Sequence, residues 1–168
     1  MLMRVEKQNK AYPLLPFSQL VFDMTRWAPW VYMFEVRWCW HGQKKELQRI
    51  ESAILQVLNH HPVFNMYVDT HGYQSYQSSP ATMKGQYYAV RLWTKGEDVY
   101  CRFRWSRILG DGKSIYIFFE NVIRAYRGEE LPPDEYLTYL DEQSHIQRSA
   151  HYAASKAWLE TTFADVQV

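Results

Sequence analysis

Apolar and polar positions alternate in the middle of the chain, and this alternation predicts β-strands. The apolar face of segment 31–41 carries Tyr32, Phe34, Val36, Trp38 and Trp40. Glu35 and Arg37 fall on the opposite face, which is typical of a half-buried strand. Shorter stretches rich in β-branched and aromatic residues predict further strands over 63–68, 73–77, 86–93 and 98–105.

Apolar residues spaced three and four positions apart predict helices elsewhere. One such stripe lies in segment 43–59 and comprises Leu47, Ile50, Ile54, Val57 and Leu58. A second lies in segment 115–126 and comprises Ile115, Phe118, Phe119, Val122, Ile123 and Tyr126. Pro62 and Gly128 end these two helices. Shorter helices are predicted over 17–25, after Asp134 as a capping residue, and over 149–162.

The order of these elements predicts an α/β fold, specifically an α+β two-layer sandwich with a mixed, mostly antiparallel sheet covered by helices. A length of 168 residues fits one domain that spans positions 1–168. The sequence is 47% hydrophobic and 17% aromatic, which excludes a disordered chain. We therefore interpret most of the tryptophans and tyrosines as core residues rather than as a platform for stacking bases.

The charge of the chain argues against two classes of binding partner. A net charge of +1 from nearly balanced signs gives no electrostatic footprint for nucleic acid or for a membrane surface. Cys39 and Cys101 are too few for a disulfide framework and indicate buried thiols in a reducing compartment. Segment 1–10 lacks the apolar core of a signal peptide, so we expect a cytoplasmic protein.

Segment 106–114 joins a predicted strand to a predicted helix, a place where active sites are common. Gly112, Lys113 and Ser114 resemble the end of a phosphate-binding loop, but that motif needs a glycine where this chain has Arg107. No serine-nucleophile elbow is present. We expect no nucleotide site.

The histidines give little support for a metal site. His60 and His61 are adjacent, and neighbouring residues on a helix point about 100° apart, so they do not converge on one ion. We interpret them as histidines at a helix C-terminus, where the helix dipole favours them. The sequence predicts no metal site.

Several segments, taken in order, resemble the condensation domains of non-ribosomal peptide synthetases. Segment 12–19 is similar to the proline- and leucine-rich opening of these domains, with Gln19 at a matching glutamine. Segment 58–67 resembles the next family block, although its Pro-x-Phe pattern is closer to alcohol acetyltransferases. Segment 107–114, and the proline break at 131–133, fall where the family has its HHxxxDG motif, helix and break. The resemblance implies the N-terminal lobe of a two-lobed, chloramphenicol-acetyltransferase-like domain.

The resemblance implies roles for four residues. Asp111 and Gly112 match the last two motif positions, where the aspartate is structural in the family. Ser106 and Arg107 occupy the two histidine positions, so the motif is degenerate. A guanidinium group remains protonated and has no lone pair, so Arg107 is unable to act as the general base that the second histidine supplies.

The leading hypothesis is therefore a catalytically degenerate lobe that serves binding or scaffolding. The alternative is an active acyltransferase that forms amides or esters with a base from His41, His71 or a second chain. An unrelated α/β binding domain is a third possibility.

The resemblance also implies substrates and partners. Family substrates are acyl thioesters linked to phosphopantetheine or coenzyme A, and no tightly bound cofactor is expected. A second condensation-like lobe, in the same longer chain or in another subunit, is the main expected partner. A carrier protein or a homo-oligomer is a further option, whereas nucleic acid and membranes are not expected.

Overall fold

The computed structural model describes residues 10–28 and 32–164. The strands of this part of the chain are β1 (Ala11–Pro13), β2 (Met33–Trp40), β3 (Met66–Val68), β4 (Tyr73–Tyr76), β5 (Tyr88–Lys95) and β6 (Asp98–Ser106). The helices are α2 (Pro16–Thr25), α3 (Leu47–His60), α4 (Gly112–Arg127), α5 (Tyr136–Gln147) and α6 (Ala150–Thr162). Two short 3₁₀ helices, η1 (Lys44–Glu46) and η2 (Pro62–Asn65), flank α3. Val31, the first residue of a predicted strand, and residues 1–9 of the N-terminal segment lie outside the described residues.

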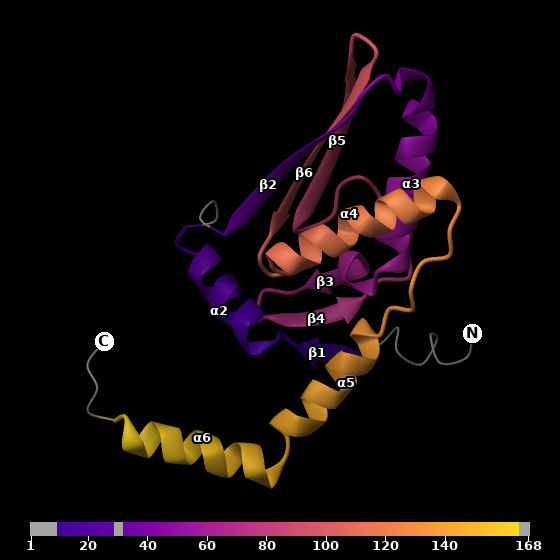
Figure 1. Ribbon diagram of the computed structural model, residues 1–168. Coiled ribbons are helices and arrows are strands. Elements are labelled where there is room, and N and C mark those ends of the chain that lie inside the picture. The colour runs from indigo at the N-terminus through magenta and orange to yellow at the C-terminus, as the bar shows by residue number, and fades with distance from the viewer. Residues whose placement is uncertain (1–9, 29–31, 165–168) are drawn as a thin grey trace.

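The α/β fold class is confirmed, with the strands divided between two antiparallel sheets (Figure 1). The larger sheet has the order β2-β6-β5, and the smaller one has the order β1-β4-β3. The pairs β3–β4 and β5–β6 are connected by tight turns, which impose antiparallel pairing. No parallel pair joins the two sheets among the described residues, so the expected single mixed sheet is replaced by two separate ones.

The main core lies between the larger sheet and helices α3 and α4 (Figure 1). The predicted apolar face of β2 turns toward this core, where the ring of Trp38 stacks on Phe119 at 4.6 Å. Phe103 of β6 is fully buried, and its ring centroid lies 4.5 Å from that of Phe118. The predicted apolar faces of the strands and helices therefore pack together in one aromatic core.

The smaller sheet has its own apolar cluster. Tyr12 of β1 and Met66 of β3 pack against Leu137 and Leu140 of α5. A third cluster joins α2 and β3 to the loop after β6 and comprises Leu14, Val21, Val68 and Ile108. The second cluster thus packs α5 on the smaller sheet, and the third packs α2 against the loop that follows β6.

Some local predictions needed correction. Residues 63–65 were expected to form a strand, but they belong to η2 because Pro62 starts a helical turn. The residue at the N-cap of α5 is Glu135, although the Asp134 carboxylate still accepts a hydrogen bond from the Tyr136 N–H at 2.8 Å. The predicted C-terminal helix is confirmed as α6, which is exposed along its whole length. No described helix is long and apolar enough to cross a membrane.

Candidate functional site

The loop after β6 is held by Ser106, the last residue of that strand. Ser106 is 2% exposed, and its Oγ accepts a hydrogen bond from the Ile108 N–H at 3.2 Å. Its carbonyl oxygen accepts a second bond from the Leu109 N–H at 3.0 Å. The Ser106 side chain is thus used to shape the turn and is shielded from solvent.

Arg107 is exposed, in contrast to Ser106. Its backbone N–H donates to the Tyr32 carbonyl at 2.9 Å, which fixes the backbone beside β2. Its guanidinium group lies over the Phe34 ring, 4.7 Å from the centroid. Stacking on an aromatic face leaves the N–H edge of a guanidinium free to bind an anion or a carbonyl group. The residue at the position of the family's second histidine is therefore an arginine whose cationic group is held over the Phe34 ring.

Asp111 begins α4 as its N-cap residue. Its Oδ1 accepts hydrogen bonds from the N–H and from the hydroxyl of Ser114, both at 2.9 Å. The Asp111 N–H donates to Ser114 Oγ at 3.2 Å, which completes a capping box. The Ser114 N–H and then its hydroxyl lower the pKa of the Asp111 carboxyl. The contacts of Asp111 thus order the start of the helix.

The two glycines around Asp111 differ in their surroundings. A Cβ atom added to Gly110 would lie 2.6 Å from Ser114 Oγ and 2.7 Å from its Cβ. A Cβ atom added to Gly112 would meet nothing within 4 Å. The capping box therefore requires glycine at position 110, although the family resemblance drew attention to Gly112.

A pocket of about 540 Å³ opens beside this loop. It is lined by the loop itself, by the first turns of α2 and α4, by η2, and by the start of α5. Its aromatic residues are Phe17, Phe64, Phe103, Trp105, Phe118, Tyr136 and Tyr139. The ionisable residues that join these rings are His61, Arg107, Asp111 and Asp134. An apolar cavity with a few polar groups is the usual form of a small-molecule site.

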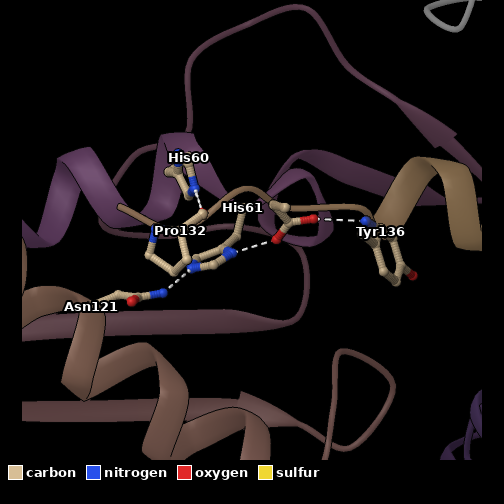
Figure 2. Close-up of polar contacts among 6 residues, drawn as sticks. His60, His61, Asn121, Pro132 and Tyr136 are labelled. Carbon is tan, nitrogen blue, oxygen red and sulfur yellow. Dashed lines mark hydrogen bonds and ion pairs between the residues drawn. The ribbon is translucent and has the colours of Figure 1, made fainter. Parts of the chain in front are cut away.

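His61 joins three elements at one side of this pocket (Figure 2). Its Nδ1 pairs with the Asp134 carboxylate, and its Nε2 accepts from Asn121 Nδ2 at 2.9 Å. The neighbouring His60 instead contacts the Pro132 carbonyl through Nε2 at 2.7 Å. Both histidines thus tie the end of α3 to the segment between α4 and α5.

Burial would by itself raise the pKa of Asp134. Hydrogen bonds from His61 and from the Tyr136 N–H, together with the positive charge of nearby imidazoles, outweigh burial and lower the pKa of this carboxyl. Burial raises the pKa of the Tyr136 phenol, which donates to Gln74 Oε1 at 3.0 Å. Asp134 is therefore an anion at neutral pH, at the edge of an apolar pocket.

Of the four predicted site residues, Arg107 and Asp111 line the pocket, whereas Ser106 and Gly112 do not. The alternative bases His41 and His71 are both absent from the pocket lining. His61 was interpreted only as a histidine at a helix end, and Asp134 only as a cap. No sequence signal joins them, because 73 positions separate the pair.

No protein-family model and no curated protein matches this sequence. Solved structures of condensation-type domains do match its fold. They include a variant of the starter condensation domain of the rhizomide synthetase RzmA, at 16% identity and a TM-score of 0.72, which covers 95% of this chain and 49% of that one. The EpoB cyclization-docking bidomain from Sorangium cellulosum matches at 12% identity and a TM-score of 0.73, over 96% of this chain and 41% of that one.

The X-domain in its complex with OxyB, from teicoplanin biosynthesis, matches at 14% identity and a TM-score of 0.72, over 95% of this chain and 45% of that one. The chain thus spans about half the length, or less, of these structures. At such low identities the likeness concerns the fold. The resemblance to condensation domains that the sequence motifs indicate is confirmed at that level: this chain has the fold of about half of a peptide-synthetase condensation domain.

Proposed function

We propose that this chain is a condensation-type lobe that binds an acyl thioester or its carrier without catalysing transfer. One observation carries the proposal: the motif loop contributes Arg107, and no histidine, to the pocket lining. A guanidinium group binds phosphate and carbonyl oxygens but accepts no proton at neutral pH. The side chains of the two other polar site residues predicted in this loop, Ser106 and Asp111, form hydrogen bonds with backbone N–H groups.

The composition of the pocket supports an acyl thioester as the ligand. The aromatic lining suits an acyl chain, and Arg107 suits the phosphate of phosphopantetheine or coenzyme A. A cavity of about 540 Å³ is within the usual range for a small-molecule site. The proposed ligand is reversibly bound, because no residue described in the pocket is poised as a nucleophile.

A second lobe is the proposed protein partner, in the same longer chain or in another subunit. Trp158, Leu159 and Phe163 are 62%, 49% and 54% exposed on and just after α6. Exposed apolar side chains that cluster on one helix are typical of an interaction surface. The X-domain, which has a similar fold, is found in complex with OxyB, and this supports a partner-binding role for condensation-type folds. A carrier protein or a second copy of this chain are further proposed partners.

Binding and turnover assays test the proposal together. We expect the wild-type protein to bind a non-hydrolysable thioether analogue of an acyl-coenzyme A and to show no acyl transfer above background. Arg107→Gln is expected to weaken binding about tenfold to a hundredfold, since a hydrogen bond to a charged group contributes about 1.5–3 kcal/mol. Arg91→Gln is the matched control, because Arg91 is exposed and does not line the pocket. Thioester turnover that Asp111→Ala abolishes would contradict the proposal, as would equal binding by the two arginine variants.

The alternative function, an active acyltransferase with a base from elsewhere, gains one specific observation. His61 lines the pocket and has a carboxylate partner in Asp134, as a general base often does. Its Nε2 is engaged with Asn121, so this base would act only after that bond breaks. This function predicts thioester turnover that His61→Gln abolishes. The turnover is expected to persist in His41→Gln and His71→Gln.

A further inference from the structure

Three side chains converge at the end of the larger sheet that lies away from the pocket. Cys39 lies near the end of β2, and His41 directly follows the last residue of that strand, with its Nδ1 3.7 Å from Cys39 Sγ. Asp98 opens β6 beside them, just before the Trp40–Val99 register pair. One potential ligand atom from each residue lies within 4.8 Å of the other two. The neighbouring β5–β6 turn lies at the top of the molecule in Figure 1.

Two distances within this cluster match those of a tetrahedral zinc site. Cys39 Sγ lies 3.7 Å from His41 Nδ1, and this nitrogen lies 3.2 Å from Asp98 Oδ2. A tetrahedral zinc ion with typical bond lengths separates sulfur from nitrogen by about 3.6 Å and nitrogen from oxygen by about 3.4 Å. These two separations are thus within a few tenths of an ångström of those that the ion requires, and the third, between the sulfur and the carboxylate oxygen, is within 4.8 Å.

The direction of the contacts argues against a catalytic relay. In a Cys-His-Asp relay the thiol and the carboxylate use opposite nitrogens of the imidazole ring. Here Cys39 Sγ and Asp98 Oδ2 both approach Nδ1 of His41. A single ring nitrogen holds one hydrogen or one lone pair, so it does not satisfy both partners well. A cation placed between the three atoms satisfies all of them.

The carboxylate and the backbone around the cluster are held in place. The Gly42 N–H donates to Asp98 Oδ1 at 2.8 Å, which leaves Oδ2 directed at His41. Hydrogen bonds of this kind orient metal-binding carboxylates. Tyr100 faces Cys39 in the β2–β6 register, and its ring stacks on Trp93 at 5.5 Å. Paired strands therefore fix the positions of two of the three ligands.

We infer that Cys39, His41 and Asp98 bind one zinc ion, with solvent in the fourth position. A thiolate, an imidazole and a carboxylate are the ligand types that zinc prefers, whereas magnesium and calcium prefer oxygen alone. The His41 side chain is 82% exposed, so water reaches the open position. Eight residues of β6, or about 26 Å of strand, separate Asp98 from the motif loop, so the ion is remote from the pocket. It joins the end of β2 to the start of β6.

Cobalt substitution tests the site directly. The full chain is stripped of metal with a chelator under reducing conditions and titrated with Co²⁺. We expect one equivalent to bind, with tetrahedral d–d absorption and a thiolate-to-cobalt charge-transfer band that added Zn²⁺ removes. Cys39→Ser is expected to abolish the charge-transfer band, and His41→Ala and Asp98→Asn to weaken binding at least about tenfold. Cys101→Ala and His71→Ala are the controls and are expected to keep the band.

Proton release gives an independent readout. Zinc binding converts the Cys39 thiol to a thiolate, so each bound ion releases up to about one proton near neutral pH. Calorimetry in two buffers with different ionisation enthalpies measures this number, and the release is expected to vanish in Cys39→Ser. Circular dichroism verifies that each variant is folded. The inference fails if the folded wild-type protein binds no Co²⁺ or Zn²⁺, or if Cys39→Ser retains the charge-transfer band.

Discussion

The contact between His61 and Asp134 is expected to stabilise the fold measurably, and a double-mutant cycle isolates its contribution. The side chains are 14% and 16% exposed, so water screens the ion pair only in part. Exposed ion pairs contribute about 0.2–1 kcal/mol, and a hydrogen bond to a charged group contributes about 1.5–3 kcal/mol. We therefore expect a coupling free energy of about 2 kcal/mol. At this chain length that corresponds to a change of about 4–8 °C in the melting temperature.

The cycle compares the wild type with His61→Ala, Asp134→Ala and the double variant by urea unfolding. Each single variant also loses another bond: Asn121 loses its acceptor in the first, and the Tyr136 N–H loses its acceptor in the second. These separate losses cancel in the cycle, which leaves the pairwise energy. The exposed pair formed by Arg124 and Glu120 is the control, with an expected coupling of about 0.3–0.5 kcal/mol. A coupling for the buried pair no larger than that of the control would refute the reasoning.

The same pair predicts how stability changes in acid. The pKa of Asp134 is lowered in the folded state, so its contribution is complete above the ordinary carboxyl pKa of about 4. The contribution is lost as the pH falls through the lowered pKa. The difference in unfolding free energy between the wild type and Asp134→Asn is therefore expected to be constant from about pH 5 to 7 and to shrink below about pH 4. A difference that persists unchanged at low pH would contradict this assignment.

Four further substitutions test the loop and the exposed helix. Gly110→Ala is expected to displace Ser114 and cost about 0.5–2 kcal/mol in unfolding free energy, whereas Gly112→Ala is expected to be neutral or slightly stabilising. Asp111→Ala removes the same capping box, so its cost in urea unfolding is expected to match that of Gly110→Ala and not to add to it. Trp158→Ala is expected to change the stability of this chain by less than about 0.5 kcal/mol, because the side chain is 62% exposed. A larger loss would show that α6 packs on this chain itself.

The sequence predicts well those elements in which one face is buried, because burial of one face makes apolar residues recur at regular spacing. The alternation over 31–41 corresponds to β2, whose described residues place Phe34, Val36, Trp38 and Trp40 against the core. The stripe of α4 ends at Gly128, which has a φ of 76° as a C-cap. The short segment 63–65 shows no such period, so the sequence does not distinguish a strand from a 3₁₀ turn there. The division into two sheets depends on long-range pairing, for which the sequence has no local signal.

The candidate site shows the same division between local and long-range information. Asp134 lies two positions before Tyr136, so its capping bond follows from helix-start chemistry. Its second bond, to His61, depends on how α3 ends. His61 leaves the helix with φ −90° and ψ 110°, so the angle expected between neighbouring helical residues does not apply to it. Interpreting His60 and His61 as consecutive helical residues was therefore the step that hid the contact with the pocket.

The loop after β6 has local contacts that order its own backbone and the start of α4. Ser106 closes the turn, Gly110 admits Ser114, and Asp111 caps α4. Each of these roles is local and independent of a histidine. At position 107 a side chain is exposed beside the Phe34 ring, while the nearby Asp111 carboxylate is engaged by Ser114. A histidine placed there would gain no orienting carboxylate from the described loop. Under the proposed function the loop positions a ligand, and proton transfer at that position would require a group from another element, such as His61, or from a second lobe.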